Sequence, residues 1–90
     1  MNATDDPGGH RRAKATHERA AKTHDRAAEL HEKSASFHDE HAVEMREKGH
    51  PECVERAERI ADHERELAEQ ERASGDKHRR SAKAEPVPGD

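Results

Sequence analysis

The sequence is poor in the residues that normally build a compact core. Its 90 residues include one phenylalanine and no tryptophan or tyrosine, and the hydrophobic fraction is 28%. Fifteen of the hydrophobic residues are alanine, which adds little apolar surface. The chain is long enough for one small domain at most, and a compact monomer would have only marginal stability.

Other absences bear on location and disulfide chemistry. A single cysteine, Cys53, cannot form an intrachain disulfide. No apolar run approaches the ~20 residues of a membrane span, and the first ten residues lack the charged and apolar parts of a signal peptide. We therefore expect a soluble, cytoplasmic protein with no membrane partner.

Motifs for catalysis and for nucleic-acid binding are also missing. The sequence has no phosphate-binding loop, no nucleophile with an adjacent base and no paired catalytic carboxylates, so we expect a protein that is not an enzyme. The basic patches at residues 11–14 and 77–83 are small, lack aromatic residues and belong to a chain of net charge −4. Binding to nucleic acid is therefore not expected.

What the sequence does contain is histidine at a regular spacing. Five of its nine histidines recur every seven residues: His10, His17, His24, His31 and His38. A seven-residue period lines one face of a supercoiled helix. Alanine recurs three and four residues after these histidines, which places histidine inside the apolar arc of the helix. Alanine, glutamate, arginine and lysine, which are strong helix formers, make up most of the repeats.

Glycine and proline divide the chain into segments. Pro7 and the glycines after it predict a flexible leader over residues 1–10, followed by one long helix over 11–48. Gly49 fits the C-terminal cap of that helix, and Pro51 fits the first turn of a second helix over 51–74 after a turn at 49–50. Gly75 is expected to end the second helix and to leave 76–90 as a basic, frayed or disordered tail. The predicted fold is all-α: an antiparallel, coiled-coil-like hairpin of two helices.

Such a hairpin brings carboxylates of the second helix to the histidine face. A two-residue turn would pair residues whose numbers sum to about 99, with Glu64 between His31 and His38 and Glu71 between His24 and His31. We expect these to form interfacial histidine–glutamate pairs, which stabilise the protonated ring, whereas unpaired buried histidines would favour unfolding in acid. The predicted seam comprises His17, His24, His31, His38, Ala20, Ala27, Ala28, Leu30, Phe37, Ile60, Glu64, Leu67 and Glu71.

The same residue types predict a candidate metal site. Two histidines near the end of the first helix fall opposite carboxylates of the second, and a histidine and the cysteine lie close together at the turn. Imidazole, carboxylate and thiolate ligands suit zinc, nickel or copper. The candidate ligands are His38, His41, Glu58, Asp62, His50 and Cys53.

Two segments resemble those of a known group of sequences. HERAAKTHDRAAELHEKSASFHDEHAVE and ERAERIADHERELAEQERA, within residues 10–74, are similar to short, uncharacterised heptad-repeat helical proteins of high-GC bacteria that are rich in Ala, Arg, Glu and His. The resemblance implies a bacterial cytoplasmic protein, and it brings with it no activity and no site.

These observations favour a small, non-enzymatic interaction or assembly protein with a pH-responsive histidine seam. In the expected alignment, the first two heptads extend beyond the second helix and leave their alanine face bare. Self-association, as in a four-helix bundle, or binding to another helical protein would cover that face. The alternatives are a transition-metal buffer or sensor, and a stress-type protein that folds only on binding.

Overall fold

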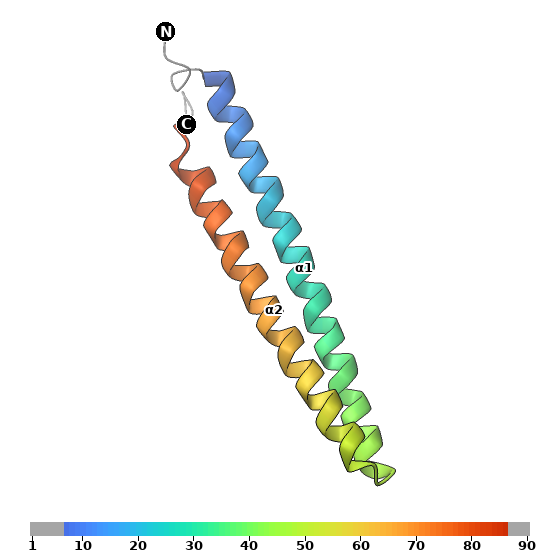
Figure 1. The fold of residues 1–90 in the computed structure, drawn as a ribbon. Coiled ribbons are helices and arrows are strands. Elements are labelled where there is room, and N and C mark those ends of the chain that lie inside the picture. Colours follow the sequence, from blue (N-terminus) through green and yellow to red (C-terminus); the bar gives the residue numbers. More distant parts are fainter. Residues whose placement is uncertain (1–6, 87–90) are drawn as a thin grey trace.

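The computed structural model describes residues 7–86 of the chain and shows two long helices. Helix α1 spans Pro7–Glu47 and α2 spans Pro51–Ala84. They pack side by side and antiparallel as a narrow hairpin of 70 × 16 × 13 Å (Figure 1). The predicted all-α, two-helix architecture is therefore confirmed. Within residues 7–86, neither helix combines the length and apolarity that a bilayer crossing requires.

The turn between the helices follows from the glycine and proline noted in the sequence. Gly49 has φ of 76°, a left-handed conformation that glycine adopts at little cost. Its amide donates to the carbonyl of Arg46, and the amide of His50 donates to the carbonyl of Met45 at 2.9 Å, the pattern of a Schellman cap. Pro51 then occupies the first turn of α2, where its missing amide hydrogen costs nothing.

Both helices are longer than predicted. α1 begins at Pro7, so the leader expected at 1–10 overlaps its first turn, and residues 1–6 lie outside the described residues. α2 passes through Gly75 and ends at Ala84, so the tail expected at 76–90 is helical as far as Ala84, and 87–90 lie outside the described residues. Gly75 does not break α2 because it is a buried packing residue: a Cβ placed there would lie 3.4 Å from the backbone oxygen of Ala21.

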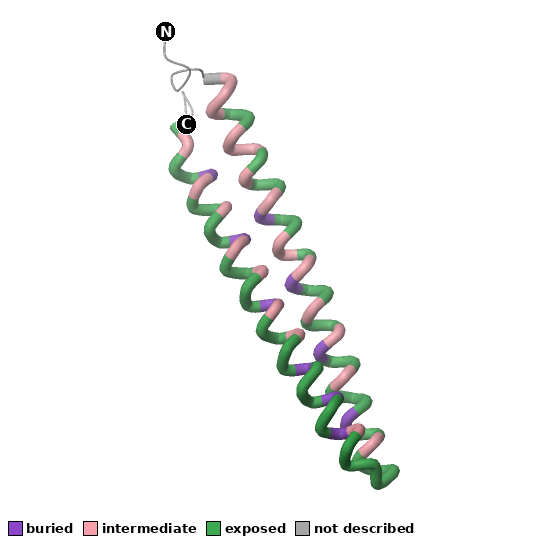
Figure 2. Tube along the Cα trace, in the orientation of Figure 1, coloured by how far each residue is buried: buried purple, intermediate pink, exposed green. Residues whose placement is uncertain are grey.

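The interior of the hairpin is built from small side chains. Buried residues recur every seven positions on the facing sides of both helices (Figure 2). We call this set the alanine column: Ala21, Ala28, Ala35 and Ala42 on α1, with Val54, Ala61, Ala68, Gly75 and Ala82 on α2. Because these side chains are short, the helix backbones can approach closely along the whole rod. Most of the exposed positions carry arginine, glutamate or lysine, which have high helix propensity.

Candidate functional site

The histidine face of α1 lies next to the alanine column and faces α2 along the hairpin. His24 Nδ1 is 2.5 Å from an oxygen of Glu71, and His31 Nδ1 is 2.5 Å from an oxygen of Glu64. Both pairs are partly exposed. The predicted histidine–glutamate pairing across the interface is therefore present in the structure, and it links the two helices by polar contacts one heptad apart.

The partners across the interface differ in detail from the predicted ones. Met45 packs against the cluster that contains Val54, and these two numbers sum to the expected 99, but the numbers of the histidine–glutamate pairs sum to 95, as in His31 with Glu64. Each carboxylate consequently meets one histidine directly instead of lying between two. The longer α2 continues the pairing to the open end of the hairpin, where His10 Nδ1 is 2.9 Å from Glu85. The first two heptads are thus covered by α2, so the bare alanine face expected there is absent within residues 7–86.

One of the layers of histidine contacts departs from the histidine–glutamate pattern. His17 Nδ1 lies 2.9 Å from His78 Nδ1, and the ring of His78 also stacks on that of His24 with centroids 5.4 Å apart. A hydrogen bond between two Nδ1 atoms requires a proton on one and a lone pair on the other. Partial burial lowers the pKa of His78 below its ordinary value of 6.5, and the charges of the nearby histidines and Lys77 lower it further.

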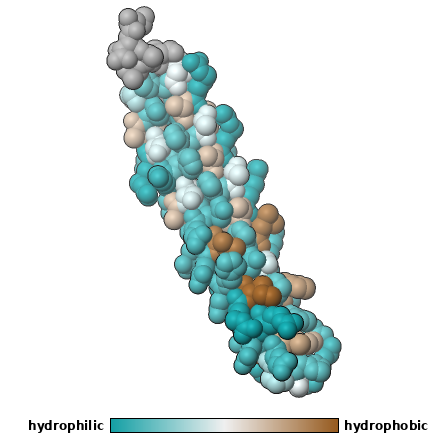
Figure 3. Space-filling view, viewed as in Figure 1, coloured by the Kyte–Doolittle hydropathy of each residue, from teal (hydrophilic) through white to brown (hydrophobic). Residues whose placement is uncertain are grey.

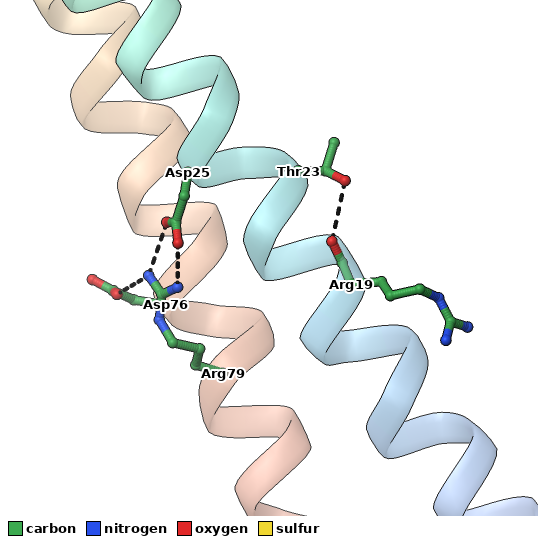
Figure 4. A network of polar contacts seen from close by, with 5 residues as sticks. All are labelled: Arg19, Thr23, Asp25, Asp76 and Arg79. Carbon is green, nitrogen blue, oxygen red and sulfur yellow. Dashed lines mark hydrogen bonds and ion pairs between the residues drawn. The ribbon is translucent and has the colours of Figure 1, made fainter.

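An ion-pair column runs along the opposite side of the alanine column. Its contacts are Asp25–Arg79, Glu32–Arg72, Asp39–Arg65 and Arg46–Glu58. Figure 4 shows Arg79 donating to both oxygens of Asp25 from across the interface, at 2.8 and 3.1 Å, and to Asp76 on its own helix at 2.8 Å. These hydrogen bonds hold the pKa of Asp25 below its ordinary value of 3.8. The arrangement can align the helices, although exposed ion pairs add little stability individually.

The predicted seam residues divide into two groups. The four histidines, the two glutamates, Ala20, Ala27 and Leu67 are half-buried, and Ala28 is fully buried. Leu30 and Phe37, however, are 66% and 64% exposed, and Ile60 is 37% exposed. These three large side chains lie beside the helix contact because α1 presents the columns of histidine and of Ala28 to α2, which turns the column of Leu30 outward.

The predicted metal ligands are not brought together. Among residues 7–86, no three histidine, cysteine or carboxylate side chains are grouped so that they could hold a metal ion. Glu58 accepts a hydrogen bond from Arg46, and Asp62 accepts one from Arg65, so both carboxylates already have cationic partners. His38, His41 and the half-buried Cys53 share the lining of a cavity of about 250 Å³, whose remaining lining residues are Phe37, Arg56, Ala57 and Ile60.

Sequence reasoning missed two parts of the site. His78 was assigned to a frayed tail, although it continues the seven-residue series that contains Glu64 and Glu71. Arg65, Arg72 and Arg79 form a second such series, and their acidic partners on α1 also recur every seven residues. In both cases, the signal was a heptad repeat in the second helix that continues through Gly75.

Comparisons with profiles of protein families, with curated proteins and with solved structures found no match to the chain. The geometry defines its class as an extended antiparallel hairpin with a small-residue interior and histidine-containing contacts between the helices.

Proposed function

We propose that this chain is a small, non-enzymatic assembly module that associates with copies of itself and whose histidine seam makes the hairpin sensitive to pH. The observation that carries the proposal is the position of the large apolar side chains. The hairpin buries alanine, whereas Leu30 and Phe37 are about two-thirds exposed. Brown, hydrophobic side chains stand out in the middle of an otherwise largely teal surface (Figure 3).

Burial of these side chains favours association. Complete burial of a leucine or phenylalanine side chain contributes ~1.5–3 kcal/mol, and Leu30 and Phe37 keep most of that area in water. Both occupy the same position of the heptad repeat, next to the column of Ile60 and Leu67 on α2. We call these four residues the apolar flank. A neighbouring hairpin placed against this flank would complete a four-helix arrangement.

Sedimentation velocity over about two decades of protein concentration tests the self-association. We expect a mass above the 10.1 kDa of one chain, rising with concentration. The double variant Leu30→Gln/Phe37→Gln should sediment as a monomer. The control is Val43→Gln, because Val43 is 51% exposed but belongs to a different heptad column. A wild-type chain that stays monomeric throughout would refute the proposal.

The pH response is assigned to the layer of His17 and His78. On α1, the rings of His17 and His24 face His78. On α2, Lys77 is the charged neighbour of His78, and Glu71 contacts His24. Because the folded pKa of His78 is lowered, the unfolded chain binds protons more readily. The contribution of this layer to the free energy of unfolding is therefore fully present above pH ~6.5, and it is lost as the pH falls from there toward the lowered pKa of His78.

Thermal melts between about pH 8 and pH 5 test this assignment. In His78→Glu, the layer becomes a histidine–glutamate pair like those of Glu64 and Glu71, and we expect a smaller loss of Tm on acidification than in the wild type. The control His38→Gln changes another of the heptad-spaced histidines, one outside this layer, and should keep the wild-type response. Equal losses of Tm in His78→Glu and the wild type would contradict the assignment.

A further inference from the structure

The apolar flank carries a protruding side chain and a cavity on the same side of the hairpin. The cavity of about 250 Å³ lies between the helices near the turn, and Phe37, Ala57 and Ile60 form much of its apolar wall. Leu30 lies one heptad before Phe37 on α1 and is 66% exposed. A second copy related by a two-fold axis midway between Leu30 and Phe37 would place each Leu30 at the cavity of the other copy.

The charges beside this flank change sign along α1. The heptad column next to Leu30 and Phe37 reads Arg12, Arg19, Arg26, Lys33, Glu40 and Glu47. In an antiparallel contact centred on Lys33, Arg26 lies opposite Glu40 of the second copy, and Arg19 lies opposite Glu47 of the second copy. A parallel contact would instead place arginine on arginine and glutamate on glutamate. Arg19, Arg26, Glu40 and Glu47 form no ion pair with one another or with any other residue from 7 to 86.

The apolar and the charged positions require nearly the same alignment. Leu30 meets Phe37 when residue numbers in the two copies sum to 67, and Arg26 meets Glu40 when they sum to 66. Building on the self-association proposed above, we propose that a second copy of this chain docks antiparallel on the apolar flank, α1 against α1, with the two-fold axis at Lys33. Leu30 of each copy then covers the cavity beside Phe37 of the other.

The size of this contact sets its expected strength. The two copies of α1 overlap over residues 19–47, roughly 43 Å at 1.5 Å per residue. A strip of that length and about 10 Å in width buries on the order of 900 Å² in total, at the low end for a specific interface. The two Lys33 side chains meet at the two-fold axis on the solvent-exposed edge of the contact, where salt screens their repulsion. We therefore expect a reversible dimer with a Kd in the micromolar range, which corresponds to a binding free energy on the order of −8 kcal/mol.

Thiol cross-linking tests the orientation directly. In a Cys53→Ser background, Lys33→Cys should give a covalent dimer with a short thiol-reactive cross-linker, because the two copies meet at the axis. Arg26→Cys alone should not, whereas Arg26→Cys mixed with Glu40→Cys should. Equal cross-linking of Lys33→Cys and Arg26→Cys would indicate a parallel dimer and refute the proposal. If the wild type associates but Lys33→Cys fails to cross-link, the docking surface is wrong while self-association stands. A monomeric wild type overturns both.

Charge reversal provides an independent test by sedimentation. Glu40→Arg should weaken the dimer at least severalfold because it places arginine opposite Arg26 of the second copy, and Arg26→Glu/Glu40→Arg should restore it. Glu66→Arg is the control, since Glu66 makes the same charge change on an exposed position of α2. Each variant is checked by circular dichroism for its helix content. An unchanged Kd in Glu40→Arg would refute the antiparallel charge match.

Discussion

Substitution of leucine for Ala28 tests whether the small residues set the distance between the helices. Ala28 is 0% exposed. Ala21 faces Gly75 toward the open end, and Ala42 packs against Val54 near the turn, so the regular spacing places Ala28 opposite Ala68. A leucine at this position has no free space, and the helices must separate locally to admit it.

The expected cost follows from overpacking. Extra methylene groups in a well-packed interior cost ~1–3 kcal/mol. A loss of about 2 kcal/mol lowers Tm by roughly 8–16 °C in a domain of this size. It is also a large fraction of the roughly 4–12 kcal/mol of total stability expected for a helical hairpin of about 80 residues. The polar pairs of neighbouring layers, such as His31–Glu64, should loosen as the backbones separate.

Thermal and urea melts followed by circular dichroism measure this cost. The control is Ala73→Leu, because Ala73 is exposed on α2 and gains the same atoms without entering the interior. We expect Ala28→Leu to be clearly less stable than both the wild type and this control. If Ala28→Leu melts at or above the wild-type temperature, the alanine column does not determine the helix spacing, and our account of the interior fails.

Two further predictions concern Gly75 and Arg79, toward the open end of the hairpin. Gly75→Ala should raise stability by no more than ~1 kcal/mol, because the gain in helix propensity is offset by close contacts of the new Cβ. This Cβ would lie 3.1 Å from Asp25 Oδ1 and 3.2 Å from Arg79 Nη2. A substantial drop in Tm would show that these side chains cannot move aside. Arg79→Gln should lower Tm near neutral pH, and the difference from the wild type should disappear in acid. The pKa of Asp25 is lowered in the folded state, so its contribution is present above pH ~3.8 and is lost as the pH falls through the lowered value. A difference in Tm that does not shrink as the pH falls below ~3.8 would contradict this assignment.

Much of the fold could be predicted because local signals agreed. Gly49 and Pro51 marked the turn, and the heptad period marked both helices. The pairing of Glu64 and Glu71 with the heptad-spaced histidines could also be predicted, since acidic residues at inward positions need a polar partner. These features depend on side-chain type and on spacing within one segment, which the sequence displays directly.

The end of α2 and the individual partners across the interface could not be predicted in the same way. Gly75 reads as a helix breaker from propensity alone, and its role becomes apparent only opposite the backbone of Ala21. The assumption of one pairing sum also fails for two helices in contact. The histidine–glutamate pairs on one side of the alanine column have a sum of 95, as in His24–Glu71, and the ion pairs on its other side have a sum of 104, as in Asp25–Arg79. Which column lies at the centre decides whether Leu30 is buried or exposed.

The alanine column alone cannot specify this alignment, because moving α2 by seven residues would again place small side chains opposite small side chains at most layers. The ion-pair column does specify the alignment. Three of its layers have the acid on α1, and the fourth is reversed, with Arg46 facing Glu58. A shift in one direction would set Arg46 against Arg65, and a shift in the other would set Asp39 against Glu58, so either slip creates a like-charge contact. Together with the short turn, the reversed pair selects the alignment in which alanine is inside and the large apolar residues are left for a partner.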